Sequence, residues 1–573
     1  MKASFLEVIP KSFRARGIFV CLTIFVRALL NFVGVAALLP ILYLILDADD
    51  MHANPILEWF YTSLGFTSDR TFVLAMSAAM VLFIVAKSLV NLLLYRIERD
   101  YIYALYRYLS RNLFIDYFNR GLQYIKRANS AVLSRNVNVV CYTFVVGILR
   151  PIATLVCEIL LLAMLFISIA IYNPSVALLA LAVFIPAAAL FYSLMRVRLG
   201  RYGNIENEAQ RRKYRDVIDT YRGYTDIEIN NAFGHQLSSF DREVDTIIGV
   251  GRKNATISML PQSFTEIGLA IGMAILVAFS VTSGGEETKL LFGLFAVAAL
   301  RLLPSVRSIM GAWGALRYNR YTIDILREAE SDSLASTPSR TNERLAFNDK
   351  IEVRNLSFRF EDSDHDTLLD FSLTINKGEK VGINGESGAG KTTLLNLLLG
   401  LYTPTEGEIA VDGVVLDKDL LRKWQNSIGY VSQSVFLADS TLLANIALGL
   451  DDSEVDMKRI EAAVEAASLS EFVASLPNGL QTRIGECGSL LSGGQRQRIG
   501  IARALYKQAD ILFFDEATSS LDSATEQSIN QAIKHLSSSH KNLTIVVVAH
   551  RESSLGYCDR IVTLEKRKKW SIV

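Results

Sequence analysis

The sequence is short of charge and of cysteine. Charged residues make up 20% of its 573 residues, and the five cysteines (Cys21, Cys141, Cys157, Cys487 and Cys558) include no CxxC pair. This spacing argues against a cysteine metal site or a disulfide framework. The formal net charge of +1 gives no electrostatic indication of a nucleic-acid partner.

Long apolar runs are abundant before residue 315. A membrane helix needs about 20 mostly apolar residues, and six segments meet this requirement. They are Ile18–Leu46, Thr71–Tyr95, Val146–Tyr172, Val176–Leu194, Leu260–Val281 and Leu291–Met310. We therefore expect the N-terminal part to be a membrane α-helical bundle of six transmembrane helices.

The distribution of Lys and Arg predicts how these helices are oriented. The connection after the first span is acidic, whereas those after the second and fourth spans are rich in Arg and Lys. Because cytoplasmic loops collect positive charge, the basic connections and the N-terminus are expected to face the cytoplasm. This orientation predicts a multi-pass protein of the cell inner membrane with a cytoplasmic C-terminal domain.

The two basic connections have helical spacing rather than loop composition. Apolar and aromatic residues recur at helical intervals in Tyr95–Phe118, without clusters of Gly, Pro or Ser. We expect the second and fourth helices to continue beyond the bilayer and to turn back near Gly121–Ala128 and Asp216–Ile229. The alternative is a pair of solvated basic loops that bind lipid head groups.

A change in composition predicts the domain boundaries. A stretch rich in Ser, Thr, Asp, Asn and Glu indicates a linker at 328–350, after a transmembrane domain at 1–327. From Ile351 onward, short β-rich runs alternate with helical stretches, as in a parallel α/β domain. The C-terminal domain is therefore expected at 351–573.

A phosphate-binding loop follows a short apolar strand at 381–384. Residues 385–392 fit the pattern G-x-x-x-x-G-K-[ST]. Glycines let backbone amides wrap around phosphate oxygens, Lys391 adds positive charge for the β- and γ-phosphates, and the Thr392 hydroxyl suits Mg²⁺. These features predict an α/β P-loop nucleotide-binding domain. The predicted nucleotide contacts are Gly385, Glu386, Ser387, Gly388, Ala389, Gly390, Lys391, Thr392 and Thr393.

Two carboxylates end a buried-strand pattern at 511–516. Asp515 suits a Mg²⁺ ligand, and Glu516 suits the general base that polarises an attacking water. A capped strand end with solvated acids is the alternative. The complete phosphate loop in the same domain favours the catalytic interpretation.

A second glycine-rich turn opens a helix at 491–495, with Ser492, Gly493, Gly494 and Gln495 after a leucine. A helix N-terminus of this kind is a further anion cradle, and one chain has no obvious need for two. At this pentapeptide the sequence resembles the ATP-binding cassette (ABC) exporters, and the resemblance covers essentially the whole chain. In that family each ATP lies between the phosphate loop of one cassette and the signature of the other. The resemblance therefore implies a half-transporter that dimerises with a second copy of itself.

The resemblance also implies roles for single residues. Phe360 matches the aromatic position that stacks on adenine, and Gln433 matches the residue that touches Mg²⁺. Asp522 falls in the loop between the two sites, and His550 matches the switch histidine at the γ-phosphate. The implied catalytic residues are Glu516, His550 and Gln433, and the implied cofactors are ATP and Mg²⁺. The implied metal ligands are Thr392, Gln433 and Asp515.

Charged residues within the predicted spans point to the cargo, because charge in a membrane helix is costly and usually functional. Lys87, Arg301 and Arg307 are candidates for a cationic cavity wall that binds an amphiphilic anionic substrate. The alternative is that each cation pairs with a carboxylate, such as Glu158 or Glu266, or reaches the interface.

A closer resemblance refines the predicted cargo. The segments Ala86–Asn91 and Arg301–Ser305 are similar to bacterial flippases of lipid-linked oligosaccharides, which implies transport of such a lipid. The alternative is a multidrug-type exporter of drugs, lipids or peptides. A soluble ATPase of DNA repair or translation is disfavoured by the six apolar segments. Arg27, near the cytoplasmic end of the first span, is expected to pair with a carboxylate or to reach the interface.

Overall fold

The chain forms two compact units in the computed structural model. The first comprises Met1–Arg120 and Tyr124–Thr337, and the second comprises Gly121–Gln123 and Pro338–Val573. The residues whose backbone the structure describes are 7–37, 55–172, 174–283, 287–330, 341–516, 526–527, 531, 534, 542–549, 555–565 and 571–572.

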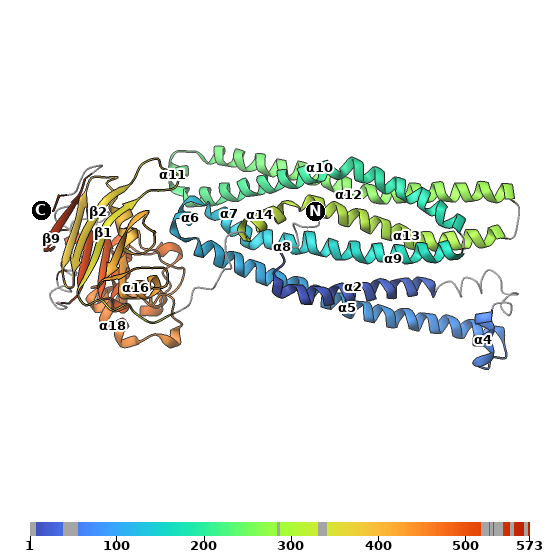
Figure 1. Ribbon diagram of the computed structural model, residues 1–573, viewed down its shortest axis with the longest axis horizontal. Coiled ribbons are helices and arrows are strands. Elements are labelled where there is room, and N and C mark those ends of the chain that lie inside the picture. The colour runs from blue at the N-terminus through green and yellow to red at the C-terminus, as the bar shows by residue number, and fades with distance from the viewer. Residues whose placement is uncertain are drawn as a thin grey trace. The chain divides into compact units, whose positions relative to one another are not determined.

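Long helices make up the first unit, and Figure 1 shows them lying alongside one another. The described part of each predicted span lies on a long helix or leads into one. The main helices are α2 (Lys11–Ala36), α5 (Asp69–Asn119), α9 (Arg150–Tyr172), α10 (Pro174–Arg222), α12 (Phe233–Ser283) and α13 (Glu287–Tyr318). The short helices are α4 (Pro55–Ser63), α6 (Gly121–Arg127, of which 121–123 belong to the second unit), α11 (Tyr224–Ile229) and α14 (Tyr321–Glu330).

Three helical stretches among the described residues are long and apolar enough to cross a membrane. They are Lys11–Ala36, Asp69–Asn119 and Ser130–Ile171. The number of six spans stays a prediction, because many side chains of the other three segments lie outside the described residues. Residues 38–46 of the first predicted span lie outside them as well.

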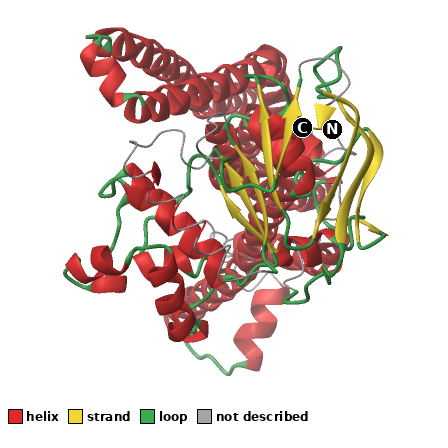
Figure 2. Ribbon diagram, turned by 90° about the vertical axis from the view of Figure 1, so that its left-hand side faces the viewer, coloured by secondary structure: helices red, strands yellow, loops and turns green. Residues whose placement is uncertain are grey.

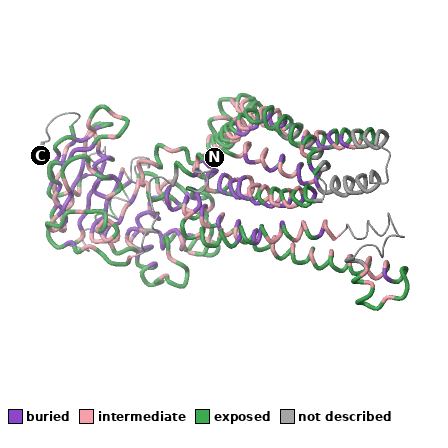
Figure 3. The backbone as a smooth tube through the Cα atoms, turned by 45° about the vertical axis from the view of Figure 1, so that its right-hand side comes forward, coloured by how far each residue is buried: buried purple, intermediate pink, exposed green. Residues whose placement is uncertain are grey.

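The second and fourth helices extend well past the apolar segments. Helices α5 and α10 contain 51 and 49 residues. At 1.5 Å per residue each is about 75 Å long, against about 30 Å of bilayer hydrocarbon. Short helices α6 and α11 follow them at the predicted turning points. Figure 3 shows exposed residues along the length of α5.

The approach to α9 contains two wide helical turns. Helix α7 (Ser130–Arg135) continues into a π-helical stretch, η2 (Asn136–Val140), then α8 (Cys141–Phe144) and a second π-helical stretch, η3 (Val145–Leu149). π-Helical turns are rare and are frequently found at functional sites. The sequence pattern gave no indication of them.

Two sheets make up the core of the second unit, and Figure 2 shows their strands as separate groups. The six-stranded sheet has the order β10-β9-β3-β8-β7-β6 and is parallel except for β10. Its strands are β3 (Lys380–Gly385), β6 (Ile428–Val431), β7 (Ile511–Asp515), β8 (Thr544–Val548), β9 (Arg560–Leu564) and β10 (Ser571–Ile572). The antiparallel sheet, β2-β1-β4-β5, consists of β1 (Lys350–Phe358), β2 (Leu368–Asn376), β4 (Glu406–Val411) and β5 (Val414–Val415).

Apolar side chains fill both faces of the six-stranded sheet. One cluster includes Phe371, Val381 and Leu394, and a second includes Phe514 and Ile499. Continuous apolar strands such as β8 are buried along their whole length, as expected for a parallel sheet covered on both faces. The described helices of this unit, beyond the part of α6 given above, are α15 (Lys391–Leu398), α16 (Leu421–Ser427), α17 (Leu442–Ile446), η4 (Asp452–Glu454), α18 (Met457–Ala466), α19 (Ser470–Ser475), η5 (Gly479–Gln481), η6 (Glu486–Gly488) and α20 (Gly493–Tyr506).

The predicted linker is shorter at its start than expected. Helix α14 continues to Glu330, because its apolar residues Ile323 and Leu326 pack into a core of the first unit. Strand β1 begins at Lys350, the last residue of the predicted linker.

A buried ion pair joins α2 to α5. Arg27 Nη1 lies 2.6 Å from Glu98 Oε2, and the two side chains are 15% and 4% exposed. The guanidinium also lies over the ring of Tyr95, 5.8 Å from its centroid. Arg27 is therefore paired with a carboxylate, as expected, but the partner is Glu98 rather than Glu158 or Glu266.

Removing one member of this pair should destabilise the first unit. In Glu98→Ala the Arg27 charge stays buried without its partner, which typically costs about 3–5 kcal/mol. We expect a lower thermal unfolding midpoint in detergent. Arg27→Met combined with Glu98→Leu should recover much of the loss. The matched control is Asp100→Ala, which removes an exposed carboxylate from the same helix. Equal unfolding midpoints for the Glu98 and Asp100 variants would contradict a stabilising role for the Arg27–Glu98 pair.

Candidate nucleotide site

The phosphate loop connects the end of β3 to the start of α15. Gly385 has a φ of +153°, and a Cβ there would lie 2.5 Å from the carbonyl oxygen of Leu564. Gly390 has a φ of +95°, and a Cβ there would lie 3.0 Å from Leu368 Cδ2. A side chain at either position would push the backbone away from its neighbours, so the loop needs glycine to stay this tight.

Lys391 is buried within the loop. Its ammonium donates hydrogen bonds to the carbonyl oxygens of Gly385, at 2.7 Å, and Glu386, at 3.0 Å. Burial lowers the pKa of Lys391, and the nearby Glu516 and Asp515 carboxylates oppose this shift. The ammonium thus lies beside the loop backbone, where a phosphate oxygen would meet it. Among the other predicted loop contacts, Glu386, Ser387, Gly388 and Thr392 are exposed, and Ala389 and Thr393 are buried.

The parallel register places the two carboxylates at the same edge of the sheet. Asp515, at the end of β7, pairs with Val548 of β8, and Val548 pairs with Ile383 of β3. The next residue, Glu516, has a φ of +46°, and its N–H donates to the carbonyl oxygen of Val548 at 2.8 Å. A left-handed conformation is unfavourable for glutamate, and such strain clusters at functional sites.

Gln433 contacts the proposed base directly. Its Nε2 donates to Glu516 Oε2 at 3.0 Å. The structure therefore brings together Lys391, Gln433, Asp515 and Glu516, all of which were predicted from the sequence. This contact fixes the direction of the Glu516 carboxylate.

Two supporting residues were missed by the sequence analysis. The Tyr430 hydroxyl lies 3.4 Å from Asp515 Oδ2, and burial raises the pKa of Tyr430, so the hydroxyl stays protonated and can donate. Gln497, buried on α20, donates from Nε2 to the carbonyl oxygen of Gln433 at 2.8 Å. Tyr430 lies in an apolar strand pattern, which gives no sign of its role. Gln497 lies two residues after the signature, and this proximity is the one sequence signal that could have indicated it.

The signature segment forms the N-terminus of α20. Ser492 caps the helix: its hydroxyl accepts from the N–H of Gln495 at 3.2 Å, and its own N–H donates to Gln495 Oε1 at 2.8 Å. Ser492 is exposed and residues 493–495 are partly exposed, so solvent reaches the N-terminal end of the helix. An exposed helix N-terminus of this kind suits an anion.

Phe360 belongs to an aromatic cluster next to the phosphate loop. It packs edge-on against Phe358 and Tyr402, with ring centroids 4.9 and 5.8 Å away. Phe358 pairs with Leu368, whose side chain approaches Gly390. The adenine-stacking role of Phe360 remains a prediction.

Several predicted residues lie outside the described part of the chain. These are Asp522, His550 and the side chain of Arg301. Lys87 packs against Gly34 of α2, and Arg307 is exposed on α13. Their assignment to a cargo cavity stays a prediction.

The donor set at the sheet edge fits Mg²⁺. The Thr392 hydroxyl, the Asp515 carboxylate and the Gln433 amide oxygen are the hard oxygen ligands that this ion prefers. Within the described ranges, no group of three or more His, Cys, Asp or Glu side chains could hold a metal. Mg²⁺ usually takes few protein ligands and completes its shell with waters and phosphate oxygens.

Comparison with known proteins identifies the class of the second unit. Residues 368–519 match the family model described as "ABC transporter". The matched range includes the phosphate loop, Gln433, the signature and both carboxylates. The second unit therefore contains an ABC transporter domain.

The wider comparisons concern most of the chain. It is 34% identical over 392 residues to an ATP-dependent lipid A-core flippase of Cupriavidus metallidurans, covering 68% of this chain and 65% of that protein. A flippase of the same name from Burkholderia pseudomallei is 34% identical over 357 residues, covering 61% and 59%. The matched part of the chain thus spans less than two thirds of the length of these relatives.

The fold matches a solved exporter. The structure of a bacterial Atm1-family ABC exporter with ATP bound has a TM-score of 0.76 and 22% identity, covering 97% of this chain and 95% of that one. Together with the ABC transporter domain, this likeness confirms the predicted fold class, a helical transmembrane region joined to an α/β nucleotide-binding domain. The matching domain and the flippase relatives confirm the resemblance to ABC exporters.

Glu516→Gln should separate nucleotide binding from turnover. The amide keeps the size of the side chain but cannot accept a proton, so ATP affinity should stay while turnover falls by roughly 10²–10⁴-fold. ATP binding and phosphate release by the purified protein are the measurements. Glu461→Gln, an exposed site on α18, is the matched control. Turnover close to that of the control would remove Glu516 from this role.

Proposed function

We propose that this chain is one half of an ATP-driven exporter that works as a homodimer in the inner membrane, with its nucleotide-binding domain in the cytoplasm. The observation that carries the proposal is the cluster at the sheet edge. There Gln433 holds the Glu516 carboxylate at 3.0 Å beside Asp515 and Lys391. These hydrolytic residues, on a chain that also carries a unit of long helices, support ATP hydrolysis coupled to transport.

Each residue of the site has a distinct task in this proposal. ATP with Mg²⁺ supplies the phosphoanhydride bond whose hydrolysis drives the cycle. Lys391 and the loop amides bind the phosphates, while Thr392, Gln433 and Asp515 hold the ion. Glu516, directed by the Gln433 amide, orients a water molecule and accepts its proton. His550 is expected to contact the γ-phosphate.

The composite arrangement of the site supports the homodimer. The exposed Ser492 cap and the amides of α20 form an anion cradle separate from the phosphate loop. In a homodimer each cradle would close on the nucleotide held by the other chain. ATP would then draw the cassettes together, and hydrolysis would release them.

Paired substitutions can test whether the site is shared between chains. Lys391→Ala damages the phosphate loop and Gly493→Asp damages the signature. If sites are shared, a dimer with one substitution on each chain keeps one intact site, whereas a dimer with both on one chain keeps none. Two affinity tags allow each mixed dimer to be purified for ATPase assays. If ATPase activity is seen only when both substitutions lie on the same chain, each chain completes its own site.

The proposed cargo is a lipid with an anionic, phosphorylated sugar head group. The aligned relatives carry the name lipid A-core flippase, and the sequence segments at 86–91 and 301–305 resemble flippases of lipid-linked oligosaccharides. Both cargo classes join a sugar to a lipid and carry phosphate. Lys87, Arg301 and Arg307 supply positive charge of the kind that such a head group requires. A multidrug-type exporter remains the alternative function.

Transport in liposomes tests the cargo. Purified protein would be reconstituted with a pyrophosphate-linked glycolipid, a phosphorylated glucosamine lipid or a neutral drug panel. We expect ATP-dependent flipping of one or both anionic glycolipids. Transport of the neutral drugs alone would favour the multidrug alternative.

Arg301→Ala should weaken flipping of the anionic glycolipid more than basal ATPase. The reason is that Arg301 is expected to bind the head group and not the nucleotide. Flipping and phosphate release would be measured on the same liposomes. Arg242→Ala, an exposed cation on α12 outside the predicted spans, is the matched control. An equal loss of both activities would point to a structural role for Arg301.

A further inference from the structure

A polar cavity lies inside the first unit, beside the two π-helical turns. It has a volume of about 320 Å³ and is lined by residues from the segment at 135–143, from α10 and from 318–321. These segments precede the third predicted span and follow the fourth and sixth. The cavity therefore lies on the side predicted to be cytoplasmic.

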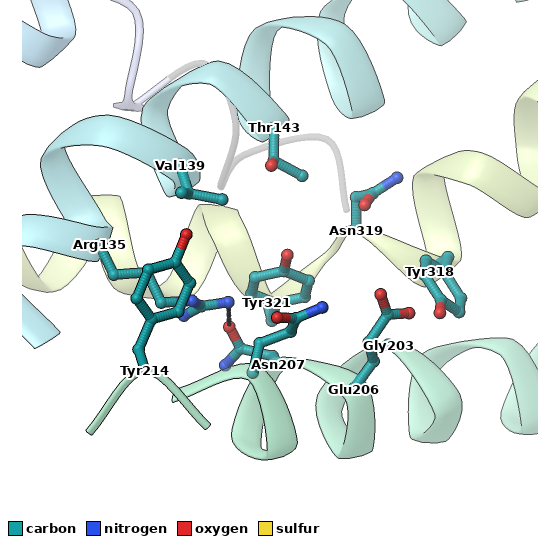
Figure 4. A pocket seen from close by; sticks show the side chains of 11 residues that line it. Arg135, Val139, Thr143, Gly203, Glu206, Asn207, Tyr214, Tyr318, Asn319 and Tyr321 are labelled. Atoms are coloured by element: carbon teal, nitrogen blue, oxygen red, sulfur yellow. Dashed lines mark hydrogen bonds between the residues drawn. The ribbon is translucent and has the colours of Figure 1, made fainter. Parts of the chain in front are cut away.

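Arg135 and Glu206 are the charged side chains in the lining of this cavity, and the Arg135 guanidinium is buried. Arg135 is only 4% exposed, and its Nη2 donates to Asn207 Oδ1 at 2.7 Å. Its Nε is buried and has no hydrogen-bond partner among the described residues. Figure 4 shows Tyr214 and Tyr321 beside the same guanidinium. A buried donor without a partner is costly, so this group is suited to an acceptor that enters the cavity.

Close backbone packing and a π-helical turn border the cavity. Gly203 lies so close to the backbone of Tyr318 that any side chain there would collide with the Tyr318 carbonyl group. Asn319, between α13 and α14, donates from Nδ2 to the carbonyl oxygen of Ala315 at 2.9 Å. The π-helical stretch η2 begins directly after Arg135, and its residue Val139 lines the cavity. A close backbone approach and a π-helical turn thus meet at one cavity, and π-helical turns are frequently found at functional sites.

The lining indicates the chemistry of a ligand. Val139 is the only aliphatic side chain among the eleven lining residues, so an acyl chain would gain little there. The lining also contains Tyr rings, the Asn207 and Gln210 amides, and the Glu206 carboxylate. Aromatic rings with amide and carboxylate groups suit a polyhydroxylated ring, and a guanidinium suits phosphate. The volume is at the lower end for ligand sites, about 300–1,000 Å³, and so fits one sugar-sized group.

We propose that this cavity binds the phosphorylated sugar of the cargo on the cytoplasmic side of the bundle. This inference rests on the proposed function, because it takes the cargo to be an anionic glycolipid. Arg135 binds the phosphate through its free Nε–H and its other N–H groups, while Asn207, Gln210 and Glu206 hydrogen-bond the sugar. The site is separate from Lys87, Arg301 and Arg307, which are expected to act within the spans.

Binding of small probes to the full-length protein in nanodiscs, without ATP, tests the cavity. The probes are N-acetylglucosamine 1-phosphate, N-acetylglucosamine and inorganic phosphate, measured by calorimetry. We expect the sugar phosphate to bind more tightly than either part. Arg135→Gln should weaken it by about tenfold or more, since a charge-assisted hydrogen bond is lost. Tyr221→Phe, an exposed tyrosine of α10 outside the cavity, should leave binding unchanged.

A second variant covers the case in which Arg135→Gln fails to fold. Gln210→Ala keeps the Arg135–Asn207 hydrogen bond and should still weaken binding several-fold. No binding to the wild type, or equal binding to Gln210→Ala and Tyr221→Phe, would overturn the proposal. Affinity for inorganic phosphate equal to that for the sugar phosphate would overturn the sugar part.

The binding assay and the flipping assay can fail separately. Sugar-phosphate binding that depends on Gln210, without any ATP-driven flipping, would support the cavity and count against the exporter function. Flipping of an anionic glycolipid that is unchanged in Gln210→Ala would support the exporter and count against the cavity.

Discussion

The parallel pairing of β3, β7 and β8 is the constraint on which the nucleotide site depends. Parallel strands end at the same edge of a sheet, so the loop after β3 and the carboxylates that end β7 and follow it must meet there. The hydrogen bond from the Glu516 N–H to the Val548 carbonyl group extends this pairing by one residue. That bond holds Glu516 in its left-handed conformation. The chemistry of the site is thus a product of strand register, and the buried apolar strands on both sides keep that register in place.

Sequence reasoning was most successful where the signal is contiguous. The phosphate loop, the strand that ends at Asp515 and the long extensions of α5 and α10 could all be predicted, because each is encoded by neighbouring residues. A role for Gln433 at the Mg²⁺ ion was implied by family resemblance rather than by spacing, and its hydrogen bond to Glu516 is seen only in the structure. Tyr430 and Gln497 were missed, because their roles depend on which strand and helix pack beside β7. No local pattern encodes those neighbours.

The membrane-side unit was harder to predict for a related reason. Hydropathy identifies apolar helices but says little about which face of each helix meets its neighbour. Arg27 was expected to find a carboxylate or the interface, yet only the packing of α2 on α5 identifies Glu98 as the partner. The cavity around Arg135 was missed entirely. It depends on π-helical turns and on one close approach at Gly203, and neither has a composition that differs from ordinary helix.

Gln497 has a mechanical consequence for the chain. Its Nε2 donates to the carbonyl oxygens of Ser432 and Gln433, just after β6, while its own helix, α20, begins at Gly493. The helix and that stretch of backbone cannot rotate independently without breaking two partly buried hydrogen bonds. A displacement of the N-terminal end of α20 would therefore reach Gln433 through Gln497. The Gln433 side chain is the one that hydrogen-bonds Glu516.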